Sequence, residues 1–197
     1  LATVALGPLA YDIAGGEAGA VLGTALAIKM IAYIGVAPVV GAYANRLPRR
    51  SFLVAMDLLR AGVALSLPFV TEVWQIYILI FVLQSTSAAF TPTFQATIPD
   101  VLPDERDYTK ALSLSRLAYD MESLISPMLA AALLLITSWH GLFFGTMLGF
   151  VASALLVLSV ILPKAQASAA NTWTDILTKG GRIYLLTPRL RGLLLLS

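Results

Sequence analysis

The chain consists of long apolar runs separated by short polar or charged breaks. A helix that spans a bilayer needs about 20 mainly apolar residues. By this criterion the sequence predicts complete spanning helices at about 19–44, 51–70, 74–98, 108–136 and 141–162. A shorter apolar stretch at about 1–13 precedes them. The pattern therefore predicts an all-α fold, a polytopic transmembrane helical bundle.

The same pattern divides the chain into three regions: a bundle at 1–162, a connection at 163–187 and the start of a seventh spanning helix at 188–197. Because the sequence has no initiator Met and ends inside an apolar run, we expect it to be a fragment of a larger protein. In the connection, Thr172 and Asp175 fit a capping box, which favours an amphipathic helix on the membrane surface. An ordinary linker is the alternative, since the glycine pair at 180–181 disfavours helix.

The amino-acid composition also indicates a protein that is embedded in lipid. Hydrophobic residues make up 58% of the chain and charged residues 12%, whereas an ordinary soluble domain has roughly 25% charged residues. The net charge of +2 gives no argument for a nucleic-acid partner. With no Cys and a single His, His140, we expect no disulfide, no histidine-built metal site and no cofactor.

Lys and Arg gather in alternate breaks between the predicted helices. The breaks at 45–50, 99–107 and 163–188 carry basic residues, and the intervening breaks carry none. Basic loops stay on the cytoplasmic side of a membrane. We therefore predict that these three loops are cytoplasmic and that the protein is a multi-pass protein of the cell inner (plasma) membrane.

The first basic break has a distinctive sequence, Gly41-Ala-Tyr-Ala-Asn45-Arg46-Leu-Pro48-Arg49-Arg50. It resembles the signature loop of the major facilitator superfamily, in which a Gly is followed by an Asp-Arg pair and then by paired basic residues. The resemblance assigns a cytoplasmic gate motif to Gly41, Asn45, Arg46, Arg49 and Arg50. The alternative is that any cytoplasmic loop can be basic.

Further segments resemble the enterobactin-exporter branch of this superfamily, namely Asp57-Leu-Leu-Arg60, the run 92–100, the stretch 111–134 and Gly181-Arg-Ile-Tyr184. The runs 92–103 and 111–120 are similar to exporters associated with nickel resistance. Two positions depart from the family, Asn45 where it usually has Asp and Phe94 where it often has Arg. Both departures remove charge, so we expect hydrogen bonding and packing to hold this gate. Only a degraded form of the family's glycine motif follows Ser126, which weakens the antiporter interpretation.

Charged residues inside the predicted spans are the strongest candidates for a substrate or proton path, because each costs about 3 kcal/mol or more at the bilayer centre unless paired or facing a cavity. They are Lys29, Asp57, Arg60, Arg116, Asp120 and Glu122. Asp57 and Arg60 lie three residues apart, and Arg116 and Asp120 four apart, so each pair shares a helix face. Structural ion pairing is the alternative to a functional role for these two pairs.

Lys29 and Glu122 have no partner of opposite charge on the same face of their own helices. We expect both to line a cavity, with Glu122 as a candidate proton carrier if burial raises its pKa. Alternatively they pair with each other or with Asp57. The hydroxyl and amide side chains at 84–95 are interpreted as hydrogen-bond groups between helices rather than as substrate ligands.

The resemblance implies a secondary active transporter, an ion-gradient-driven exporter of a small molecule or a metal ion that works by alternating access. Its partners are the lipid bilayer, the substrate and the missing C-terminal half. The sequence shows no nucleophile with a base and no phosphate-binding loop, so we expect no enzyme. The competing class is a polytopic membrane protein that does not transport, such as a sensor or an intramembrane enzyme.

Overall fold

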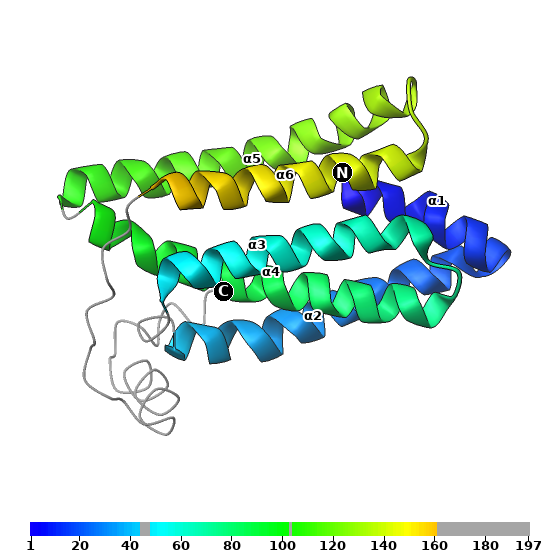
Figure 1. Ribbon diagram of the computed structural model, residues 1–197, viewed down its shortest axis with the longest axis horizontal. Helices are drawn as coiled ribbons and strands as arrows, with labels where there is room; N and C mark the ends of the chain where they lie inside the picture. The colour runs from blue at the N-terminus through cyan, green and yellow to red at the C-terminus, as the bar shows by residue number, and fades with distance from the viewer. Residues whose placement is uncertain (44–47, 103, 161–197) are drawn as a thin grey trace, which may run out of the picture. The chain divides into compact units, whose positions relative to one another are not determined.

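A computed structural model describes residues 1–43, 48–102 and 104–160 of the chain. Every regular element within these ranges is helical (Figure 1). The α-helices are α1 (Ala2–Ala14), α2 (Ala18–Tyr43), α3 (Arg49–Ser66), α4 (Val73–Val101), α5 (Glu105–Leu134) and α6 (Trp139–Ser159). The predicted all-α bundle is thereby confirmed.

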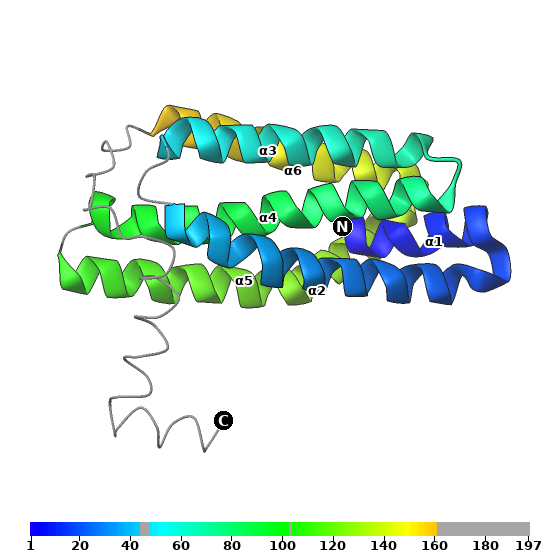
Figure 2. The same ribbon diagram turned by 90° about the horizontal axis from the view of Figure 1, so that it is seen from below.

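Five stretches of the described chain are long and apolar enough to cross a membrane. The first, Ala2–Gly41, contains α1 and most of α2, which run side by side in opposite directions (Figures 1 and 2). The chain reverses in a 3-10 turn, Gly15–Glu17, where Gly15 has a φ of 54°. A side chain is disfavoured in that left-handed region, so a glycine suits the turn. The protein is a multi-pass membrane protein.

Local signals set the other helix ends. Glu72 and Gln75 form a capping box at the start of α4, and the Asp104 carboxylate accepts a hydrogen bond of 2.8 Å from the Arg106 amide at the start of α5. Helix α4 continues through Pro99 to Val101, beyond the end at 98 that the sequence predicted. Helix α5 begins at Glu105 rather than at 108, because the Asp104 cap lies further upstream.

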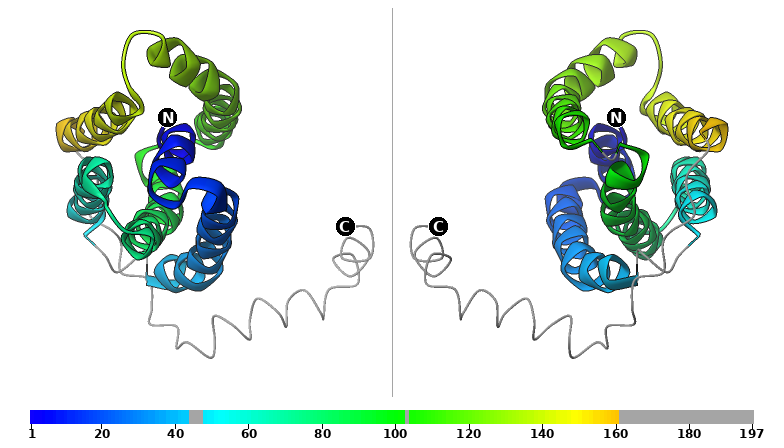
Figure 3. Two further views of the ribbon diagram at one scale, coloured as in Figure 1. Left: turned by 90° about the vertical axis from the view of Figure 1, so that its right-hand side faces the viewer. Right: turned by 90° about the vertical axis from the view of Figure 1, so that its left-hand side faces the viewer.

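The helices pack unequally. Helix α3 packs against α4 and α6, and α2 packs along α4, as the view along the helices shows (Figure 3). The largest fully buried side chains of the core include Leu9 of α1, Ile76 of α4 and Phe143 of α6. Helix α5 makes far fewer contacts, and Ala130 is its one buried residue.

Candidate functional site

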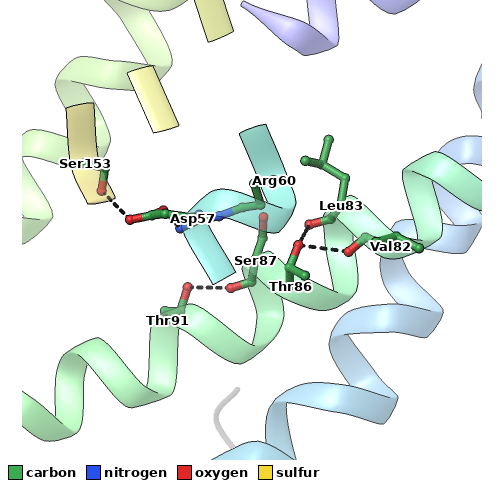
Figure 4. A network of polar contacts seen from close by, with 8 residues as sticks. All are labelled: Asp57, Arg60, Val82, Leu83, Thr86, Ser87, Thr91 and Ser153. Atoms are coloured by element: carbon green, nitrogen blue, oxygen red, sulfur yellow. Dashed lines mark hydrogen bonds and ion pairs between the residues drawn. The ribbon is translucent and has the colours of Figure 1, made fainter. Parts of the chain in front are cut away.

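The most buried charged cluster joins α3 to α6. Asp57 of α3 is 0% exposed and Arg60, one turn later, is 9% exposed. Arg60 Nη2 forms a hydrogen-bonded ion pair with Asp57 Oδ1, and Ser153 Oγ of α6 donates a hydrogen bond of 2.8 Å to Asp57 Oδ2 (Figure 4). The ion pair expected from the sequence spacing is present, and both carboxylate oxygens of Asp57 have partners.

Two aromatic rings enclose the Arg60 guanidinium. Its central carbon lies 4.2 Å from the ring centroid of Phe90 on α4 and 4.7 Å from that of Phe150 on α6. Such contacts stabilise a cation that has lost its water. Phe94, at the position where the resembled family often has an arginine, stacks on Phe90 with ring centroids 5.9 Å apart. We call Asp57, Arg60, Phe90, Phe150 and Ser153 the α3 cluster.

The threonines of α4 do not bond between helices in the described structure. Thr86, Thr91 and Thr93 donate to carbonyl oxygens one turn earlier in α4, for example Thr93 to Ala89 over 3.0 Å. Figure 4 shows this for Thr86 and Thr91. The interpretation as interhelical hydrogen-bond groups is therefore wrong for these three. A hydroxyl in an apolar helix satisfies itself most easily on the free lone pair of a nearby carbonyl.

A cavity of about 960 Å³ lies beside the α3 cluster, with walls from α2 to α6 and from Leu1, the first residue of the given sequence. Asp57 and Arg60 lie on its wall, and Glu122 faces it from α5. Further lining residues include two tyrosines and several hydroxyl side chains: Tyr33, Ser87, Thr91, Tyr119, Ser126 and Thr146. The cavity thus combines aromatic rings, hydroxyl groups and one carboxylate that has no hydrogen bond or ion pair among the described residues.

Lys29 is not among the residues that line this cavity. Its side chain is half-buried on α2, and the described part of the chain offers it no hydrogen bond or ion pair. Pairing of Lys29 with Asp57, one of the alternatives left open by the sequence, does not occur, because Arg60 and Ser153 occupy that carboxylate. Pairing of Lys29 with Glu122 is also absent within the described ranges.

Arg116 and Asp120 are both exposed and do not form an ion pair with each other in the described structure. The expectation of a local pair was wrong here, although the spacing is suitable. An acidic residue preceding a basic one is the better order at this spacing, and this helix has the reverse order. Neither residue lines the cavity.

A second, smaller pocket of about 440 Å³ adjoins the first. Its lining is almost wholly apolar and includes Leu53, Phe94, Ile98, Leu102, Leu156 and Val157. Phe90 and Ser153 line both pockets. The α3 cluster therefore forms the boundary between a polar and an apolar space.

The predicted gate motif is described in part. Gly41 lies close to α4, since a Cβ atom added to it would meet the Pro92 Cβ at 3.8 Å. Arg49 is buried at the start of α3, and Arg50 donates a hydrogen bond from Nη2 to the Leu158 carbonyl in the last turn of α6. Residues 45 and 46, Asn45 and Arg46, lie outside the described residues, as do the predicted connection at 163–187 and the helix start at 188–197.

Sequence reasoning missed Ser153, Phe90 and Phe150. Each looks like an ordinary residue of an apolar span, and only the packing of α3 between α4 and α6 brings them to Asp57 and Arg60. A buried Arg in a span does signal that a partner must exist. It does not say which helix provides one.

Comparisons with known proteins complete the description of the site. The family profile described as "Major Facilitator Superfamily" matches residues 1–196. The "Uncharacterized MFS-type transporter YfiS" of Bacillus subtilis (strain 168) is 29% identical over 136 residues, which cover 68% of this chain and 32% of that protein. "Macrolide efflux protein A" of Enterococcus faecalis is 26% identical over 153 residues, covering 73% and 47%. The protein of that name from Streptococcus pyogenes is 26% identical over 149 residues, covering 73% and 36%.

The chain thus spans between about a third and a half of the length of the curated relatives it matches. No solved structure gives a significant match.

Proposed function

Because the chain belongs to the major facilitator superfamily, we propose that the full-length protein is a secondary transporter that exports a small molecule across the cell inner (plasma) membrane. This chain provides the first six-helix half, and a second half completes the translocation path. The transporter works by alternating access and draws on an ion gradient. Two relatives with efflux in their names support export as the direction.

The observation that carries this proposal is the charged wall inside the membrane-spanning bundle. Asp57, Arg60 and Glu122 line one cavity from α3 and α5. Ionisable residues within spans are costly, and they are retained where they serve a pathway or a binding site.

The lining favours an organic solute with apolar surface and hydrogen-bonding groups. Tyr33, Phe90, Tyr119 and Phe150 provide aromatic surface, and the hydroxyls of α4 and α6 provide polar contacts. Binding sites for organic molecules combine these features. Leu1 lines the cavity, so a residue that precedes it in a longer protein would occupy part of the cavity volume. The proposed substrate class therefore follows from the chemistry of the wall and not from the cavity volume.

A metal ion is the second candidate substrate, suggested by the resemblance of 92–103 to nickel-resistance exporters. Imidazole suits nickel, and nitrogen and oxygen ligands form its typical sites. Within the described ranges no three His, Cys, Asp or Glu side chains come together in a way that could hold a metal. The aromatic lining therefore makes the organic solute the first choice.

We assign different roles to the two carboxylates. Asp57 is fully occupied by Arg60 and Ser153, so it holds α3 to α6 and presents the Arg60 guanidinium to the cavity. Glu122 is exposed rather than buried, so its proposed role rests on its place in the cavity wall and not on burial. Water can deliver or remove a proton there. Glu122 is thus the proposed proton carrier, and the α3 cluster is the fixed part of the wall.

The proposed orientation places the loops at 45–50, 99–107 and 163–188 in the cytoplasm. Arg50 then ties the cytoplasmic ends of α3 and α6 together through the Leu158 carbonyl. Gly41, Arg49 and Arg50 are the described part of the gate motif. The α3 cluster lies about 12 Å further along α3, at 1.5 Å per residue from Arg49 to Asp57.

The test is uptake into everted membrane vesicles that contain the full-length protein. A panel of macrolides, lipophilic dyes, siderophores and nickel is offered with and without a proton gradient. We expect gradient-dependent uptake of an organic compound, and loss of its coupling in Glu122→Gln. Glu17→Gln, in the turn between α1 and α2, is the matched control. Uptake of nickel and of no organic compound would mean that the substrate is a metal ion. Unchanged coupling in Glu122→Gln would mean that Glu122 does not carry the proton.

A further inference from the structure

The charges on the wall of the large cavity do not balance. Among the described residues, the charged side chains that line it are Asp57, Arg60 and Glu122. Asp57 and Arg60 form an ion pair (Figure 4), so their charges compensate each other. Glu122 has no hydrogen bond or ion pair within the described ranges. The described wall is therefore negative at Glu122.

Aromatic rings lie on the same wall as this carboxylate. Tyr119 precedes Glu122 by three residues on α5, so the two side chains share a helix face, and both line the cavity. Tyr33 lines the cavity from α2. The two tyrosines are 50% and 37% exposed, so packing leaves part of each ring free. Aromatic faces attract cations, and rings of this kind bind organic cations in proteins.

The depth of Glu122 in the bundle makes a partner valuable. At 1.5 Å per residue, Glu122 lies about 26 Å along α5 from Glu105, and the hydrocarbon core of a bilayer is about 30 Å thick. Charges at such depth are costly unless they are paired or face water. A ligand of opposite charge would provide the pairing that the described side chains do not.

We infer that the cavity binds the positively charged group of a lipophilic organic cation, with the Glu122 carboxylate as its counter-ion and the rings of Tyr119 and Tyr33 beside it. The apolar part of the ligand would lie against Ile125 and Leu129, which line the cavity further along α5. The inference rests on the proposed function and adds the charge of the substrate to it.

An organic anion is the opposing candidate, because Arg60 also lines the cavity. Its charge is already compensated by Asp57, and the rings of Phe90 and Phe150 cover its guanidinium. An anion would have to displace a carboxylate from Arg60 and would meet the charge of Glu122 in the same space. Both effects favour the cation.

The test compares two ions of nearly equal shape and opposite charge, tetraphenylphosphonium and tetraphenylborate. Equilibrium dialysis measures their binding to the full-length protein in detergent, with protein-free micelles as the blank and a mildly alkaline buffer that keeps Glu122 ionised. We expect the cation to bind at least about tenfold more tightly, because the sign of the charge is the main difference between the ions. Equal affinities, tighter binding of tetraphenylborate, or no binding of tetraphenylphosphonium would overturn the inference.

Variants then assign the cation to its counter-ion. Glu122→Gln should weaken tetraphenylphosphonium binding at least about tenfold, and Glu122→Asp, which retains the charge, should preserve part of the affinity. Tyr119→Leu should weaken binding several-fold, whereas Tyr119→Phe retains the ring and should not. Asp120→Asn is the matched control, since this carboxylate is on the same helix and does not line the cavity.

The melting temperature of each variant confirms that it is folded. Unchanged binding in folded Glu122→Gln, or an equal loss in Asp120→Asn, would overturn the inference. Binding needs no ion gradient, so a protein that binds the cation without transporting any compound contradicts only the proposed function. A protein that transports only uncharged or anionic compounds contradicts only the inferred charge of the substrate.

Discussion

The Ser153 hydroxyl of α6 donates a hydrogen bond of 2.8 Å to Asp57 Oδ2 of α3, the carboxylate oxygen that does not pair with Arg60. The two residues are far apart in the chain, and their contact fastens two closely packed helices around a buried charge. A buried carboxylate is stable only when its oxygens have partners. The Ser153 hydroxyl therefore provides one of the partners that the buried Asp57 carboxylate needs.

Removing that hydroxyl should destabilise the bundle. Ser153→Ala leaves Asp57 Oδ2 without this donor, and a hydrogen bond to a charged group contributes about 1.5–3 kcal/mol. Thermal unfolding in detergent, followed by tryptophan fluorescence, measures the loss. Ser159→Ala is the matched control, because its exposed hydroxyl bonds only within α6. Equal melting temperatures for the two variants would show that the Ser153 contact contributes nothing.

The Asp57–Arg60 pair should behave as a unit. Asp57→Asn or Arg60→Gln alone leaves the partner charge buried, which costs about 3–5 kcal/mol. The double variant removes both charges. Its loss in free energy of unfolding should therefore be well below the sum of the losses in the two single variants. Urea unfolding of all four proteins completes this double-mutant cycle. Strict additivity would mean that the two side chains do not interact in the folded protein.

The Phe90 ring should stabilise the Arg60 cation. Phe90→Leu removes an aromatic face 4.2 Å from the guanidinium, at a cost of about 1–2 kcal/mol, whereas Phe90→Tyr retains the face. Phe81→Leu on the same helix is the control, since that ring is 46% exposed. In thermal unfolding, the melting temperature of Phe90→Leu should be lower than that of Phe90→Tyr. The reverse order would argue against a cation–π contact.

Arg50 should hold the last turn of α6. Its guanidinium donates to the Leu158 carbonyl, and a cation at a helix C-terminus contributes about 0.3–1 kcal/mol. Arg50→Ala should therefore speed amide hydrogen exchange in the last turn of α6, and Arg50→Lys should restore part of the protection. Exchange that is unchanged in Arg50→Ala would leave the α6 end without this cap. Arg106→Ala, an exposed residue of α5, is the comparison.

Much of the fold follows from local sequence because lipid imposes a strong rule. Spans must be long, apolar and helical, so hydropathy indicates them directly. The ion pair of Asp57 and Arg60 could be predicted too, since both residues lie on one helix at a known spacing. Ser153 and Phe150 could not be predicted, because their role depends on α6 lying beside α3, and no local pattern encodes which helices become neighbours.

Arg116 and Asp120 show where a spacing rule fails. Their separation on α5 is as suitable for pairing as that of Asp57 and Arg60, yet only the latter pair forms in the described structure. The exposed pair of Lys110 and Asp107 on α5, with Nζ and Oδ1 3.6 Å apart, shows that burial is not required. In both pairs that form, the acidic residue precedes the basic one, which is the favourable order on a helix, whereas Arg116 precedes Asp120. A spacing allows a pair, and the order of the charges favours or disfavours it.

The most direct test of the proposed transporter asks whether water reaches the wall of the large cavity from one side of the membrane. Single cysteines replace Ser87 and Thr91, which line the cavity, and Ile78 and Phe81 of the same helix, which are 53% and 46% exposed. The full-length protein, otherwise free of cysteine, is treated with a membrane-impermeant maleimide in right-side-out and everted vesicles. We predict reaction at 87 and 91, slowed by a transported solute, and little reaction at 78 and 81. No reaction at 87 and 91 in either orientation would contradict the proposed transport path.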